Sequence, residues 1–232
     1  MAFDMETRTM RLRSLTIFVL ILTALVSSAL AQREEIRESE YTTVLAEALH
    51  KASTLDRRII TDESFYTGSQ VTGTRRIISD FVGKDAKRID VTEDFNGKKT
   101  RSNSITLNGQ FFCKDGEKAW KRADKDCARS GKMMAIPDGE YEYFVEPDPN
   151  IAGLKVYTRR AAYTDSGSAE RDEARLKFIE IKFTTDENGA ITRYTETRRG
   201  GLEPNGWSST QVTVYDYDKS DLKIDDPTRK NY

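Results

Sequence analysis

The sequence predicts an α+β fold in which a curved antiparallel β-sheet carries an N-terminal amphipathic helix on its concave side. Three observations predict it: one segment with helical periodicity, a long series of β-branched and aromatic segments after it, and tight-turn dipeptides between those segments. We expect a half-barrel meander of about eleven strands. A parallel sheet would need crossover connections of about a dozen residues or more, and the chain leaves no room for them.

The helix is predicted over Ser39–Ala52. Its main apolar side chains recur at intervals of three and four residues and form a single stripe; they are Tyr41, Val44, Leu45, Ala48, Leu49 and Ala52. Ser39 is a residue type that caps helix N-termini. The pattern indicates a helix that lies with one face on a flat apolar surface.

The strands are predicted from runs rich in β-branched and aromatic residues, separated by Gly, Asp and Asn. Their expected ranges are Arg58–Tyr66, Gly73–Val82, Ala86–Phe95, Thr100–Leu107, Gln110–Cys113, Ala119–Arg122, Glu140–Val145, Leu154–Tyr163, Ala174–Thr184, Ala190–Thr197 and Ser209–Tyr217. The dipeptides Asn96-Gly97, Asn108-Gly109 and Asn188-Gly189 lie between such runs and favour tight hairpins. We therefore expect each strand to pair with the next one along the chain.

Side-chain alternation along these strands is imperfect. In one strand, Leu176 and Phe178 fall on one face, whereas Ile179, Ile181 and Phe183 fall on the other. Either both faces are covered, or a bulge lies between Phe178 and Ile179. Charged residues on the strands predict a solvated outer surface; examples are Arg75, Asp80, Lys87, Asp90 and Glu93.

Residues 1–31 have the three parts of an export signal. Arg11-Leu12-Arg13 is basic, Leu15–Val26 is almost purely apolar, and Ala29-Leu30-Ala31 is a small-residue cleavage motif. Cleavage after Ala31 would leave residues 32–232 as a single domain in the periplasm or outside the cell, without a stable membrane span.

Two alternatives about this segment stay open. The apolar run approaches the length of a membrane-spanning helix only when its small residues are counted, so an uncleaved anchor is the second interpretation. Asp4 and Glu6 are unusual ahead of an export signal, which indicates that translation starts at either Met1 or Met10.

Composition and cysteine usage narrow the class of protein further. The chain has 37 basic and 38 acidic side chains, evenly mixed, so it lacks the basic face that nucleic-acid binding requires. Cys113 and Cys127 are the only cysteines, and in an exported chain such a pair is expected to form a disulfide. Their spacing differs from the C-x-x-C of redox enzymes.

The sequence offers little for catalysis, and we expect neither an enzyme nor a cofactor or metal. His50 is the only histidine, which excludes a Ser-His-Asp triad that needs a second histidine and all multi-histidine zinc sites. Phosphate-binding and nucleophile motifs are absent. Carboxylates are abundant, with Asp216 and Asp218 in the densest group, so a secreted hydrolase remains the weakest of the alternatives.

The concave side of the predicted sheet is the candidate binding site. Its expected lining is apolar and consists of Leu45, Leu49, Phe65, Ile78, Phe81, Phe95, Phe112, Trp120, Met133, Met134, Ile136, Phe144, Tyr157 and Phe183. Met133, Met134 and Ile136 belong to an apolar stretch in a long connection and are expected to fold over the sheet as a lid. Each lining residue can equally be ordinary core.

Three stretches carry a resemblance to a known family. They are Ile105–Cys113 followed by Trp120-Lys121, then Ile191–Thr197, and the ending Val212–Pro227. Together with the export signal, helix and meander, they resemble the LolA/LolB-like periplasmic lipoprotein carriers, whose half-barrel is shared by mycobacterial lipid-binding lipoproteins. The chain departs from these carriers in its cysteine pair and in the polar insertion Thr164–Arg171.

The resemblance implies a non-enzymatic carrier that binds a lipid or a lipoprotein acyl chain inside the half-barrel, with envelope proteins as possible partners. The alternative from another class is a structural or interaction module of the envelope, whose concave face is filled by its own side chains.

Overall fold

The computed structural model describes residues 33–127, 140–162, 176–201, 206–218 and 222–227. The fold belongs to the compact unit Glu35–Tyr232. The predicted export signal of residues 1–31, the predicted lid residues Met133, Met134 and Ile136, and the insertion Thr164–Arg171 lie outside the described residues.

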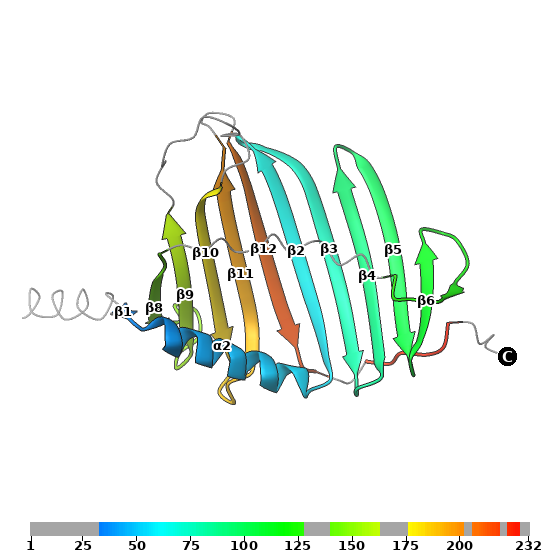
Figure 1. Ribbon diagram of the computed structural model, residues 1–232, viewed down its shortest axis with the longest axis horizontal. Coiled ribbons are helices and arrows are strands. Elements are labelled where there is room, and N and C mark those ends of the chain that lie inside the picture. The colour runs from blue at the N-terminus through cyan, green and yellow to red at the C-terminus, as the bar shows by residue number, and fades with distance from the viewer. Residues whose placement is uncertain (1–32, 128–139, 163–175, 202–205, 219–221, 228–232) are drawn as a thin grey trace, which may run out of the picture. The chain divides into compact units, whose positions relative to one another are not determined.

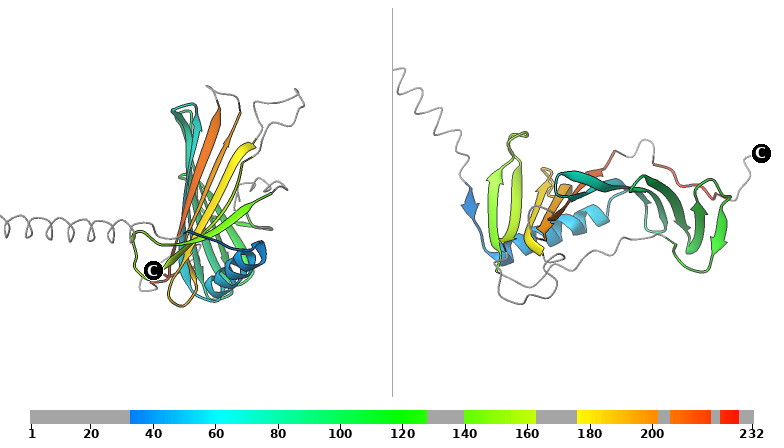
Figure 2. Two further views of the ribbon diagram at one scale, coloured as in Figure 1. Left: turned by 90° about the vertical axis from the view of Figure 1, so that its left-hand side faces the viewer. Right: turned by 90° about the horizontal axis from the view of Figure 1, so that it is seen from above.

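The described part of the chain forms an open, curved antiparallel sheet of twelve strands with one helix (Figures 1 and 2). The elements are β1 (Glu34–Glu35), α2 (Glu38–Ser53), β2 (Arg57–Thr67), β3 (Gln70–Val82), β4 (Ala86–Phe95), β5 (Lys98–Leu107), β6 (Gln110–Asp115), β7 (Lys121–Ala123), β8 (Glu142–Pro147), β9 (Lys155–Ala162), β10 (Leu176–Thr185), β11 (Ile191–Gly200) and β12 (Trp207–Asp216). The strand number exceeds the predicted one because β1 has only two residues, both glutamates, and so carries no alternating pattern.

The strand order is β1-β8-β9-β10-β11-β12-β2-β3-β4-β5-β6-β7. Two meanders, β2–β7 and β8–β12, are therefore joined where the last strand, β12, pairs with the first long strand, β2. The prediction that each strand pairs with the next is wrong for β7 and β8, which lie at or next to opposite edges of the sheet. The β12–β2 pairing includes all of β12 and all of β2 except Arg57, from Trp207 opposite Thr67 to Asp216 opposite Arg58.

The tight turns follow the sequence prediction. Asn96 and Gly97 have φ values of 52° and 77°, and Asn108 and Gly109 have 50° and 74°. Two successive left-handed residues form the hairpin turn whose twist matches that of the strands, and Asn-Gly adopts it at the lowest cost. In the β10–β11 turn, the carboxylate of Asp186 accepts hydrogen bonds from the backbone N–H groups of Asn188 and Ala190.

Helix α2 is present where the periodicity predicts it, but its start and its position differ from the prediction. Arg37 occupies the N-cap without a side-chain cap, so Ser39 lies inside the helix. The helix packs mainly on β8 and β11 and leaves β3–β7 without a covering helix (Figure 2). Its side chains explain the position, because Tyr41 lies between the rings of Tyr143 and Phe183, 5.3 Å from each.

The two faces of the sheet follow from the register, because directly opposed residues share a face. We call the face that carries α2 the helix face and the other the outer face. One row of the helix face runs from β10 to β4 through Phe183, Tyr194, Thr213, Thr61, Ile77 and Val91. The β9–β10 register is regular from Phe178 to Thr184, and the shift between β10 and β11 lies between Leu176 and Phe178. The bulge predicted between Phe178 and Ile179 is therefore absent at that position, and the irregularity lies between Leu176 and Phe178 instead.

The register also corrects the prediction about charged side chains. Arg75, Lys87 and Glu93 lie on the helix face, whereas Asp80 and Asp90 lie on the outer face. The prediction of one charged outer surface is wrong because both faces of β3 and β4 carry charge.

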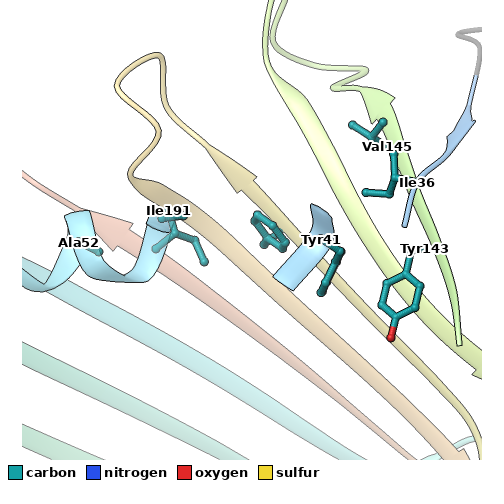
Figure 3. Close-up of a cluster of buried hydrophobic side chains, with 8 residues drawn as sticks. Ile36, Tyr41, Ala52, Tyr143, Val145 and Ile191 are labelled. Atoms are coloured by element: carbon teal, nitrogen blue, oxygen red, sulfur yellow. The ribbon is translucent and has the colours of Figure 1, made fainter. Parts of the chain in front are cut away.

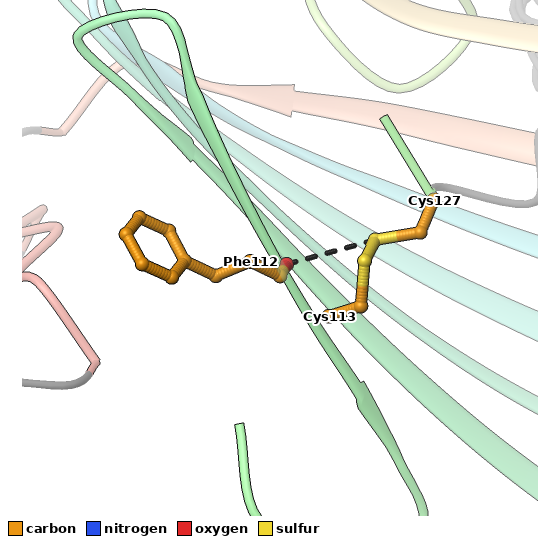
Figure 4. The surroundings of a disulfide bond; sticks show 3 residues. All are labelled: Phe112, Cys113 and Cys127. Atoms are coloured by element: carbon orange, nitrogen blue, oxygen red, sulfur yellow. Dashed lines mark hydrogen bonds between the residues drawn. A yellow bond between two sulfur atoms is a disulfide. The ribbon is translucent and has the colours of Figure 1, made fainter. Parts of the chain in front are cut away.

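The disulfide is confirmed: Cys113 of β6 is bonded to Cys127, which follows β7, with the Cα atoms 6.1 Å apart (Figure 4). Cys127 Sγ lies 3.7 Å from the carbonyl oxygen of Phe112. The bond ties the end of the chain segment after β7 to the sheet. Among the described residues, no helix is both long enough and apolar enough to cross a membrane.

Candidate functional site

The core under the helix is made of apolar and aromatic side chains. It contains Ile36, Tyr41, Ala48, Ala52, Tyr143, Val145, Phe183 and Ile191 (Figure 3). Phe183 is 1% exposed, and its ring stacks on that of Tyr157 at 5.0 Å. This part of the helix face is filled by the protein's own side chains.

Several tyrosine hydroxyls are enclosed in or beside this core. Burial raises the pKa of Tyr217 to about 12, and the Tyr217 hydroxyl donates a hydrogen bond to the carbonyl oxygen of Ile191 at 2.5 Å. Burial also raises the pKa of Tyr41 and of Tyr194, the latter with a contribution from the Glu196 carboxylate. These hydroxyls therefore stay protonated over the physiological range.

A second apolar region lies on the helix face of β2–β6, away from the helix. It consists of Ile59, Ile77, Phe81, Ile89, Val91 and Phe111, which the register places in three adjacent rows. We call these residues the apolar patch. Val91 is buried and the others are half-buried. Since α2 packs mainly on β8 and β11, the patch has no covering helix (Figure 2).

A depression of about 380 Å³ lies at one end of the apolar patch. Phe81 and Phe111 of the patch line it together with Gly83, Lys84, Asp85, Ala86, Lys87, Thr106, Gly109 and Asp126. The Lys87 ammonium lies 5.7 Å from the centre of the Phe81 ring. The depression therefore combines two aromatic rings with charged groups of both signs.

A polar row crosses the helix face beside the patch. Arg75 donates to Glu93 at 2.7 Å and to Glu63 at 2.9 Å. In the same row, on β11, Glu196 is 7% exposed and accepts hydrogen bonds from Tyr194 and from Arg198. The carboxylates of Glu63, Glu93 and Glu196 are thus each held by an arginine.

Arg159 of β9 differs from Arg75 and Arg198, because its guanidinium contacts aromatic rings and no carboxylate among the described residues. Its guanidinium lies over the ring of Tyr141, 3.7 Å from the ring centre, and 5.9 Å from that of Tyr143. Its Nε atom is buried without a hydrogen-bond partner, and so is the hydroxyl of Tyr41. An unsatisfied buried donor costs about 1–3 kcal/mol, so this pair of groups calls for an explanation.

The structure separates the predicted lining residues into several environments. Leu45, Tyr157 and Phe183 pack in the core at the helix, whereas Leu49 is 43% exposed. Phe65 and Phe95 form a ring pair with centres 5.3 Å apart on the helix face, beside Gly73, whose missing side chain leaves room for the Phe95 ring. Phe81 belongs to the apolar patch, and Trp120 precedes β7 and is half-buried.

Ile78, Phe112 and Phe144 lie on the outer face, so they are not brought together with the other predicted lining residues. The predicted set mixes both faces because aromatic and aliphatic residues occur on both sides of these strands.

Several residues of the helix face were missed by sequence reasoning. Ile59, Ile77, Ile89, Val91 and Phe111 could have been found by asking which residues share a parity with Phe81 across the predicted hairpins. Arg159 lies in a strand with adjacent arginines, Arg159 and Arg160, and nothing in the sequence distinguishes the one that faces the helix side.

No protein-family model matches the sequence, and no curated protein matches it.

Proposed function

We propose that the chain is an exported, non-enzymatic binding or carrier protein that holds an apolar ligand, such as a lipid or a lipoprotein acyl chain, against the helix face of a half-barrel. The observation that carries the proposal is the apolar patch, since it gathers large apolar side chains in three adjacent rows of the sheet that no helix of the described residues covers. Such surfaces are typical of sites that another apolar body covers. The resemblance to LolA/LolB-like carriers points the same way.

The disulfide supports the proposed location. Disulfides persist in oxidising compartments such as the periplasm or the extracellular space, and Cys113 and Cys127 are bonded. The export signal in residues 1–31 is the sequence feature that would deliver the chain there.

The polar row supports a binding role rather than hydrolysis. Acid–base chemistry of the glycosidase kind requires two carboxylates that face a common cleft. Glu63 and Glu93 are instead both bonded to Arg75, and Glu196 is bonded to Arg198. These interactions favour ion-paired, structural carboxylates.

A second candidate function is a structural or interaction module of the envelope. The observation that favours it is the core under α2, where Tyr41, Phe183 and Ile191 fill the helix face. In that case the apolar patch contacts another protein, and no small apolar molecule accompanies the chain.

The test is native mass spectrometry of the protein purified from its own envelope. We expect bound lipid in the wild-type protein and its loss in Ile77→Gln, which places an amide in the apolar patch. Ile78→Gln is the matched control, because Ile78 is the adjacent residue, equally half-buried, on the outer face. A wild-type protein that is consistently free of lipid, or equal loss of lipid in both variants, contradicts the proposal.

A further inference from the structure

Among the described residues, the guanidinium of Arg159 contacts no carboxylate. Arg75 and Arg198 each contact a carboxylate on the same face. The Arg159 guanidinium instead lies over the ring of Tyr141 and near that of Tyr143. Its Nε–H is buried and donates to nothing. Guanidinium groups in such positions ordinarily pair with a carboxylate or a phosphate.

A second donor without an acceptor lies beside it. Tyr41 is 1% exposed, and its hydroxyl has no hydrogen-bond partner. Both groups lie by the ring of Tyr143, whose centre is 5.3 Å from the centre of the Tyr41 ring and 5.9 Å from the Arg159 guanidinium. Burial raises the pKa of the Tyr41 hydroxyl, and the charge of Arg159 acts in the opposite direction. Buried polar groups in folded proteins are satisfied almost without exception, so two adjacent orphan donors indicate a missing acceptor.

Glu196, a neighbouring acid, does not accept a hydrogen bond from either group. Glu196 is close enough to act on the Tyr41 hydroxyl, but its two carboxylate oxygens are bonded to Tyr194 and Arg198. The Glu196 carboxylate is paired with Arg198, and within the residues that the structure describes no carboxylate contacts the Arg159 guanidinium. An oxyanion is the kind of group that these two donors can bind, because it carries a negative charge and only accepts hydrogen bonds.

Apolar side chains lie next to Arg159 on β9 and β10. Arg159 is directly opposed to Ile181 of β10, and the buried side chains of Ala161 and Ile179 form the next pair along the same two strands. A strongly hydrated free ion is disfavoured in such surroundings. A charged group at the end of an apolar body fits them better.

We propose that Arg159 and the Tyr41 hydroxyl bind the oxyanion headgroup, a carboxylate or a phosphate, of the apolar ligand. This inference rests on the proposed function and narrows the ligand class to anionic amphiphiles.

The experiment compares hexadecanoic acid with hexadecan-1-ol, which differ in the headgroup alone, by competition with a fluorescent lipid probe at pH 8. The wild-type protein is expected to bind the acid about tenfold more tightly than the alcohol, which is the effect of one charge-assisted contact. Arg159→Gln is expected to remove this preference and to leave the affinity for the alcohol unchanged.

Arg160→Gln is the matched control. Arg160 is the next residue of β9, lies on the outer face and is paired with Glu142 at 2.6 Å, so its loss should leave the preference for the acid intact. Tyr41→Phe removes only the hydroxyl and should reduce the preference in part. Arg159→Lys keeps the charge and serves if Arg159→Gln does not fold, as judged by thermal unfolding; it should retain most of the preference.

The outcomes separate the two proposals. If neither amphiphile binds the wild-type protein, the proposed function fails. If both bind with equal affinity, or if Arg159→Gln keeps the preference, the headgroup site is overturned while the binding function stands. Inorganic phosphate is the third probe: if it displaces the acid and not the alcohol at submillimolar concentration, the site takes free anions, and the headgroup assignment is overturned.

Discussion

The strands β8–β12 and the strands β2–β7 belong to one sheet, but different interactions stabilise their helix faces. Under α2, aromatic and aliphatic side chains such as Tyr41, Phe183 and Ile191 exclude water. Beyond the helix, the same face combines the half-buried apolar patch with the ion pairs of Arg75. The disulfide between Cys113 and Cys127 links β6 to the segment after β7 at the edge of this region. We refer to these regions as the covered half and the open half.

The difference teaches what each half can do. A filled core contributes stability and fixes the position of the helix, whereas a face with half-buried apolar groups can exchange water for a ligand. The apolar patch of the proposed binding surface therefore lies in the open half, whereas the proposed headgroup site at Arg159 and Tyr41 lies in the covered half. The stability of the protein is expected to depend mainly on the covered half.

The largest expected effect comes from removing one aromatic ring from each half. Phe183→Ala leaves a cavity between Tyr41 and Tyr157 and is expected to reduce the free energy of unfolding by about 3–5 kcal/mol. Phe95→Ala in the open half removes a ring that is 36% exposed and is expected to cost about 1–2 kcal/mol. Urea denaturation measures both; equal losses would contradict the distinction between the two halves.

The disulfide gives the next effect, confined to the open half. The cysteines are 14 residues apart, so replacing both by serine is expected to lower the free energy of unfolding by about 3 kcal/mol in the chain-entropy model. Hydrogen exchange should show the first loss of protection in β6 and β7. Earlier loss in β10 and β11 would mean that the disulfide supports the covered half as well.

The smallest effect is alkaline destabilisation of the covered half. The pKa of Tyr217 is raised from its ordinary value of 10.0 to about 12, so its contribution to stability is complete below pH 10 and is lost as the pH rises through 12. The free energy of unfolding is therefore expected to be lower at pH 12 than at pH 9. Tyr217→Phe should show a smaller decrease, and an equal decrease would assign the effect to other groups.

Much of the local structure could be predicted from the sequence. The period of Tyr41, Ala48 and Ala52 predicts α2, and the Asn-Gly dipeptides at Asn96 and Asn108 predict two hairpins, because both signals depend only on neighbouring residues. The cysteine pair predicts the disulfide for a different reason, because two cysteines can pair within the chain in only one way.

The arrangement of the two halves could not be predicted, because it depends on contacts between distant residues. No local pattern in Arg58–Tyr66 indicates that this strand pairs with the end of the chain. The faces were also ambiguous: Ile77 and Ile78 are adjacent and equally apolar, and only the register with β2 and β4 assigns them to opposite sides. For the same reason, Arg159 could not be separated from Arg160.

The pairing of β2 with β12 has a consequence for the order in which the chain folds. Thr61 and Thr213 share a hydrogen bond across this pair although 152 residues separate them, and α2, which precedes β2, packs on strands from the second meander. Closing such long loops is entropically costly and slows folding. The first meander can form hairpin by hairpin as the chain emerges. The helix, however, remains without its partners until β8 and β11 have formed, and one edge of β2 remains unpaired until β12 arrives. The protein is thus a late-closing fold, whose exposed edge and helix need protection from aggregation until the chain is complete.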